Sequence, residues 1–149
     1  MSINEQIMPS PKGLIVSYTD DVSGLTGSAT DYDLRTAKQQ ALLALVRELA
    51  LGIVDDERQV DVSVYSGPDR DEFNRLHLVT TAAESLTGCK ANRYGWTADV
   101  AAIDALRELA DSVAEKLHGG WKPVPPPVAQ EEAQQITYSE SGASCGAMG

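Results

Sequence analysis

The sequence has few aromatic residues, few cysteines and no long apolar run, and each shortage excludes a class of protein. Aromatic residues make up 5% of the 149 positions, so aliphatic side chains must provide most of the core. Two cysteines, Cys89 and Cys145, cannot form a disulfide framework or a cysteine metal site. No stretch approaches the roughly twenty apolar residues of a membrane span, and the N-terminus lacks a secretion signal. We therefore expect a cytoplasmic protein without membrane association.

Basic residues are also scarce. Twelve Lys and Arg stand against 22 Asp and Glu, which gives a net charge of −10, and the basic residues form no cluster. Direct binding to a nucleic-acid backbone is therefore not expected. The acidity fits ordinary solubility, or alternatively mimicry of a polyanion that occupies a basic groove of a partner.

The strongest pattern lies in residues 31–51, where apolar residues recur at spacings of three and four. This spacing predicts an amphipathic helix, with Thr30 as its N-cap and Gly52 at its end. The stripe consists of Leu34, Ala37, Ala41, Leu42, Leu45, Val46 and Leu49.

The middle of this helix, residues 41–46, is apolar all round. One side must pack on the fold, and the other needs a second cover, which is either another element or another subunit. We take Leu42, Leu43 and Val46 as candidates for a protein interface.

Two strands are expected around this helix, at residues 13–19 and 59–65. The second alternates Val60, Val62 and Val64 with polar residues, as in a strand with one solvated face. The order strand, helix, strand resembles a βαβ unit, in which the strands would be parallel.

Two more helices are expected after the second strand. Residues 66–88 combine an early proline, acidic residues and helical spacing, although the segment 76–81 also favours a strand. Residues 97–117 carry a narrow apolar seam suited to packing on one other helix.

These elements predict an α/β or α+β fold, a small sheet with about three helices in the order β-α-β-α-α. The globular domain is expected at residues 13–118, after a flexible arm at 1–12. Residues 119–149, with four prolines near their start, are expected to form a linker and a disordered tail, unless residues 136–139 add a strand to the sheet edge.

No motif indicates catalysis, a metal ion or a cofactor. Gly24 and Gly27 lack the spacing of a dinucleotide fingerprint, and no P-loop lysine follows them. His77 and His118 have no neighbouring nucleophile or carboxylate at a diagnostic spacing. We therefore predict neither a catalytic residue nor a metal ligand.

The connector at residues 89–96 has an unusual composition for an acidic chain. It can pair with an anionic group and stack on a flat one, which makes it a candidate site for a nucleotide-like anion. Alternatively, its aromatic rings anchor the loop on the core while its cations face solvent. The candidate ligand-binding residues are Lys90, Asn92, Arg93, Tyr94 and Trp96.

Binding is the function that these features predict. The leading hypothesis is a small non-catalytic regulator, adaptor or inhibitor that acts by self-association or by docking to a protein. A small-ligand-binding protein is the second hypothesis. The third is the precursor of a modified peptide, because Ser139, Ser141, Ser144 and Cys145 offer weak potential for thioether chemistry in the tail.

Overall fold

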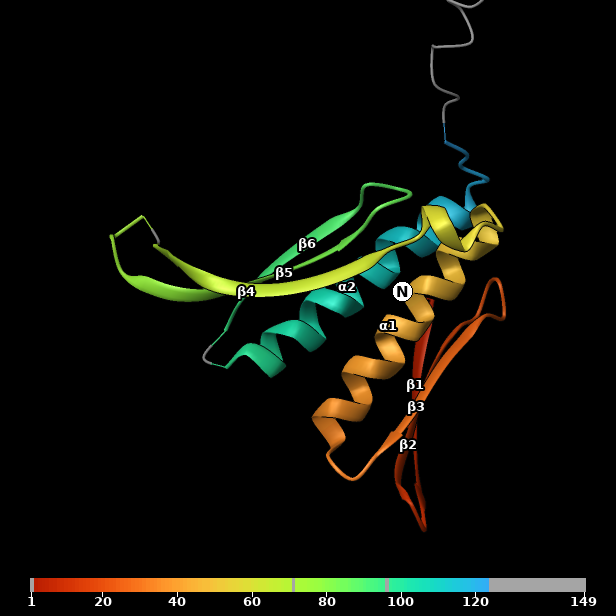
Figure 1. Ribbon diagram of the computed structural model, residues 1–149, viewed down its shortest axis with the longest axis horizontal. Coiled ribbons are helices and arrows are strands. Elements are labelled where there is room, and N and C mark those ends of the chain that lie inside the picture. Colours follow the sequence, from red (N-terminus) through yellow and green to blue (C-terminus); the bar gives the residue numbers. More distant parts are fainter. Residues whose placement is uncertain (1, 71, 96, 124–149) are drawn as a thin grey trace, which may run out of the picture.

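The computed structural model describes residues 2–70, 72–95 and 97–123, which form the same arrangement of elements twice (Figure 1). Each unit is three antiparallel strands followed by one long helix. The two helices lie side by side in the middle, and each packs on the sheet of its own unit.

The first unit consists of β1 (Ile3–Ser10), β2 (Gly13–Asp20), β3 (Thr26–Asp31) and α1 (Leu34–Ile53). Strand β2 is central and pairs with both neighbours. Its alternating residues point into the core, because successive side chains of a strand face opposite ways.

The second unit begins with the short 3-10 helix η1 (Glu57–Gln59) and repeats the pattern. It contains β4 (Val62–Arg70), β5 (Leu76–Glu84), β6 (Lys90–Gly95) and α2 (Ala98–His118). Strand β5 is central in this sheet.

The two helices bury the same pattern of positions, 64 residues apart. The ion pair between Arg35 and Asp99 joins two residues at this spacing. The matching buried pairs are Ala37 and Ala101, Ala41 and Ala105, Leu42 and Leu106, Leu45 and Leu109, Val46 and Ala110, Leu49 and Val113, and Ala50 and Ala114. All of these side chains except Ala101 belong to one apolar core that both helices and both sheets share.

The predicted helices at residues 31–51 and 97–117 are confirmed, with small changes at their ends. Asp33, not Thr30, caps α1, because its carboxylate accepts a hydrogen bond from the backbone N–H of Thr36 at 3.1 Å. The helix also continues through Gly52 to Ile53.

The expected helix at residues 66–88 is wrong. This segment forms the end of β4, a turn and β5, so the alternative strand at 76–81 is the correct one. Three-four spacing is present in the sequence, but Thr80 and Ala82 are buried in alternation, which only a strand allows.

Three edge strands replace segments expected to be irregular. The arm at residues 1–12 contains β1, the segment between the expected strand at 13–19 and the expected helix at 31–51 contains most of β3, and the connector at 89–96 contains β6. Pro9 is tolerated in β1 because this strand lies at a sheet edge, where one side needs no backbone N–H donor.

The topology also corrects the expected parallel pair. Strands β2 and β4 belong to separate antiparallel sheets, so no βαβ unit joins them. The fold is a mixed one of two three-stranded sheets and two long helices, rather than one small sheet with three helices.

Candidate binding surface

The outer face of the sheet β4–β5–β6 is an open surface that no described element covers. In β5, Thr80 and Ala82 are buried toward α2, so Val79 and Thr81 point to the opposite side. The strand register places Tyr65 of β4 and Asn92 of β6 beside Thr81 on that same side.

Two tyrosines dominate this outer face. Tyr65 is 70% exposed and Tyr94 is 60% exposed, which is unusual in a chain with so few aromatic residues. The space between them is a shallow hollow of about 400 Å³. Its lining consists of Tyr65, Gly67, Pro68, Asp69, Val79, Thr81, Asn92 and Tyr94.

Hydrogen bonds and ring packing hold the polar part of this surface in place. The Thr81 hydroxyl donates to Asn92 Oδ1 at 2.6 Å, which leaves the Asn92 amide N–H groups directed elsewhere. The ring of His77 lies edge-on to that of Tyr94, with 5.8 Å between their centroids. The face therefore combines apolar area with fixed donors and acceptors.

A second hollow, of about 730 Å³, lies on the other side of β6, between this strand and α2. Arg93 reaches across it and forms an ion pair with Glu108. Arg107 lies 3.7 Å from a carboxylate oxygen of Glu5 in the first unit. The hollow is lined by Asn92, Arg93, Tyr94, Asp104, Arg107, Glu108 and Asp111.

The alternation of β6 divides the predicted ligand-binding residues. Asn92 and Tyr94 face outward, whereas Arg93 points toward α2. Lys90, at the start of the strand, lines a separate hollow with Cys89, Ser112, Glu115 and Lys116. Trp96 lies outside the described residues. Of the four described residues, Asn92, Arg93 and Tyr94 therefore line the β6–α2 hollow together, whereas Lys90 lines a separate one.

The charge of the β6–α2 hollow does not favour an anionic ligand. Both of its arginines already have carboxylate partners. Burial raises the pKa of Asp111, and Asp104 adds a further acidic group to the lining. A cationic group suits this lining better.

The predicted interface residues contribute to the core of the fold. Leu42 and Val46 are fully buried members of the core, and Leu43 packs against it with partial exposure. The apolar segment was expected to be covered either by another element or by another subunit. In the structure it is covered by another element, helix α2. Leu42 and Val46 are thus not accessible to a partner in this conformation.

A buried carboxylate links the first unit to the end of α2. Asp20 accepts hydrogen bonds from the hydroxyls of Ser2 at 2.5 Å and Ser23 at 2.6 Å, and contacts His118 Nε2 at 2.6 Å. Burial opposes the ionisation of Asp20, but the bonds from His118, Ser2 and Ser23 outweigh it and lower its pKa.

The corresponding residue of the second unit, Glu84, has a purely local role. It is also buried, and it accepts bonds from the backbone N–H groups of Leu86 and Thr87 in the following turn. The shared feature is therefore a carboxylate that closes the turn between the second and third strands. The contact with His118 is an addition in the first unit, and we assign it a structural role.

The alternation in residues 59–65 puts Tyr65 on the solvated face of the strand expected there, whereas the expected helix at 66–88 assigned Val79 and Thr81 to no sheet face. Alternation in residues 76–81 is the sequence signal for these two residues.

The structure bears on metal binding and membrane spans only within the residues that it describes. Within residues 2–70, 72–95 and 97–123, no group of three or more His, Cys, Asp or Glu side chains is arranged to hold a metal ion. None of the helices in these ranges is long and apolar enough to cross a membrane. The residues considered for peptide modification, Ser139, Ser141, Ser144 and Cys145, lie outside the described residues.

Comparisons of the chain with protein-family models, with curated proteins and with solved structures gave no match. The functional assignment therefore depends on the geometry of the surface itself.

Proposed function

We propose that this chain is a non-catalytic binding protein, of the regulator, adaptor or inhibitor type, that holds a protein partner on the outer face of β4–β5–β6. The observation that supports it is the pair of exposed tyrosines, Tyr65 and Tyr94, on either side of a hollow in an uncovered sheet. Tyrosine is enriched at protein interfaces because it offers a rigid apolar ring and a polar end at low entropic cost.

The first unit provides an internal reference for this face. Ile3 pairs with Asp20, and Val62 pairs with Glu84; these are the buried carboxylates that end the two central strands. Counting along the strand from these pairs, Gln6 of β1 corresponds to Tyr65 of β4. At the spacing of 64 that relates the helices, Thr30 corresponds to Tyr94. The same framework is thus built with Gln and Thr at these positions, and the tyrosines are not needed to form it.

The hollow has the composition of an interface centre rather than of an ordinary solvated face. Among its eight lining residues only Asp69 carries a charge, and the ring of Tyr65 lies beside Gly67, where an added Cβ atom would be 3.6 Å from it. Charged residues are depleted at the centre of protein interfaces, because their desolvation is costly.

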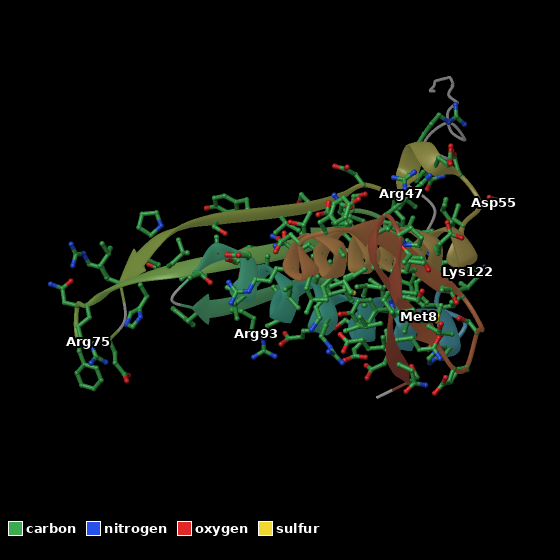
Figure 2. The ribbon with its side chains drawn as sticks, turned by 90° about the horizontal axis from the view of Figure 1, so that it is seen from below. Met8, Arg47, Asp55, Arg75, Arg93 and Lys122 are labelled. Carbon is green, nitrogen blue, oxygen red and sulfur yellow. The ribbon has the colours of Figure 1, made fainter. Side chains whose placement is uncertain are left out.

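The β4–β5 hairpin extends this surface. The segment from Val62 to Glu84 is longer than its counterpart from Ile3 to Asp20, and the hairpin reaches beyond α2 (Figure 1). Phe73 and Leu76 near the turn are 69% and 63% exposed. In Figure 2, Arg75 of the same turn lies far from the body of the molecule. A partner seated on the tyrosines can therefore also contact the hairpin.

A photo-cross-linking experiment tests this proposal. A photoreactive amino acid replaces Tyr94 in one variant and Thr30, its counterpart in the first unit, in the matched control. Both positions are exposed and lie on outer sheet faces. In the source cells, the variant at 94 is expected to form one dominant covalent product with a protein.

Equal products from positions 94 and 30, or no product from 94, would contradict the proposal. A product with a second copy of the chain would identify self-association, which light scattering on the purified protein then measures directly.

A further inference from the structure

Strand β6 offers a free edge beside the proposed surface. It pairs with β5 on one side, and no strand of the described part of the chain pairs with its other side. The backbone N–H of Glu84 donates to the carbonyl of Cys89 at 3.0 Å, which sets the register. In an antiparallel ladder the direction of the backbone groups alternates, so those of Asn92 and Tyr94 point to the free edge.

The β6–α2 hollow lies directly next to this edge. In the first unit, Gly27 allows α1 to lie so close to β3 that a methyl group there would be 2.7 Å from the Cα of Leu45. The second unit has Ala91 at that position, with a buried side chain that stands between strand and helix. A side chain therefore separates α2 from β6, whereas the backbones of α1 and β3 meet directly at Gly27, and the hollow lies beside β6.

The other edge strands are less suited to pairing. Pro9 lies in β1 and Pro68 in β4, and proline lacks the backbone N–H that a new strand would need. Strand β3 is held close to α1 by Gly27. Among the described edges, β6 alone combines an uninterrupted backbone with an adjacent hollow.

We infer that an extended segment of the protein partner pairs with the free edge of β6 as an additional strand, with basic residues at every second position. This inference rests on the proposed function and specifies how the partner binds. Strand addition to an exposed edge gains affinity from backbone hydrogen bonds and specificity from alternate side chains.

The two faces of the added strand would meet different surroundings. One set of its side chains would lie beside Tyr94 on the outer face. The other set would enter the β6–α2 hollow, where Asp104 and Asp111 have no ion-pair partner among the described residues. Lysine or arginine at alternate positions matches this second set of contacts.

Peptide binding tests the inference. The probe is a capped, fluorescent peptide of about ten residues that alternates lysine with threonine, a length that spans a long strand. The control peptide has the same composition but places all lysines in one block. Binding is measured by fluorescence anisotropy at low and physiological salt. The alternating peptide is expected to bind about tenfold tighter, a difference of about 1.4 kcal/mol.

Two protein variants separate specific contacts from general charge. Asp104→Asn combined with Asp111→Asn is expected to weaken binding of the alternating peptide about tenfold. The matched control, Glu48→Gln combined with Asp55→Asn, removes the same charge at exposed positions elsewhere and is expected to leave affinity unchanged. Figure 2 places Asp55 far from Arg93.

Amide hydrogen exchange provides a readout independent of charge. On binding, the amides of Asn92 and Tyr94 are expected to become protected, whereas those of Ala91 and Arg93 are already protected by pairing with β5. Equal binding of both peptides, equal loss in both double variants, or protection away from β6 would each overturn the inference. These results leave the cross-link at position 94 unaffected, so failure of the inference is distinguishable from failure of the proposed function.

Discussion

Asp20 illustrates how one side chain fixes several segments of this fold. Its carboxylate is inaccessible to solvent and is held by groups from before β1, from the turn after β2 and from the end of α2. A buried carboxylate is stable as an anion only when such donors surround it. The folded state therefore favours the charged form.

The Asp20 carboxylate makes stability depend on pH. Its pKa in the folded state is below the ordinary value of about 3.9, so it stabilises the fold above that pH and loses this contribution as the pH falls. At pH 7, Asp20→Asn is expected to lower the free energy of unfolding by about 2 kcal/mol. The difference in the free energy of unfolding between wild type and Asp20→Asn should become smaller below about pH 4.

Urea unfolding of wild type and variant at both pH values measures this difference. Asp55→Asn, at an exposed position, is the control and should change little. A deficit that stays constant with pH would mean that the charge of Asp20 is not what stabilises the fold.

At the scale of elements, the sequence was informative wherever an element buries a continuous face. Both long helices and strand β2 follow patterns of apolar residues that only one structure satisfies, and β4 shows the same alternation with half-buried Val62 and Val64. Strands β1, β3 and β6 have mainly exposed side chains, and long-range pairing determines their structure. Because this pairing is not local, no short window of the sequence indicates it.

The candidate surface was predicted in part for the same reason. Asn92 and Tyr94 were identified from composition, but their separation from Arg93 depends on the alternation of an edge strand that was not expected. The repeat of the two units is itself visible in the sequence. Ala37, Ala41, Leu42, Leu45 and Ala50 of α1 have identical residues 64 positions later in α2, and such a spacing indicates repeated units.

The approach of α1 to β3 gives a prediction at this scale. Gly27→Ala would place a methyl group against the backbone of α1, which cannot move without disturbing the core. We expect a loss of about 3 kcal/mol in the free energy of unfolding. Ala91→Gly, at the equivalent position, should cost only about 1 kcal/mol. Equal losses, measured by urea unfolding, would show that the two helices approach their sheets equally.

At the scale of the whole molecule, the two units share one core. The buried cluster contains side chains from both helices and both sheets, and the described residues contain no separate core for either unit. Calorimetry is therefore expected to show a single transition, with equal calorimetric and van't Hoff enthalpies. Leu109→Ala should lower the stability of both units by about 3 kcal/mol. Two resolved transitions would mean that the units fold independently.

The shared framework also separates what the fold requires from what binding requires. The first unit forms its sheet with Gln6 and Thr30 where the second has Tyr65 and Tyr94. The outer tyrosines are exposed and contribute little to the core, so they can change without loss of structure.

The most direct test is the double variant Tyr65→Gln and Tyr94→Thr, in which the outer face of the second sheet carries the residues found at the corresponding positions of the first. Thermal unfolding and the yield of the partner captured by cross-linking, now from a photoreactive residue at Asn92, are measured on the same protein. We predict an unfolding temperature within a few degrees of wild type, and a loss of captured partner of about tenfold or more. An unchanged yield of the partner, in a protein that remains folded, would contradict the assignment of this face as the binding surface.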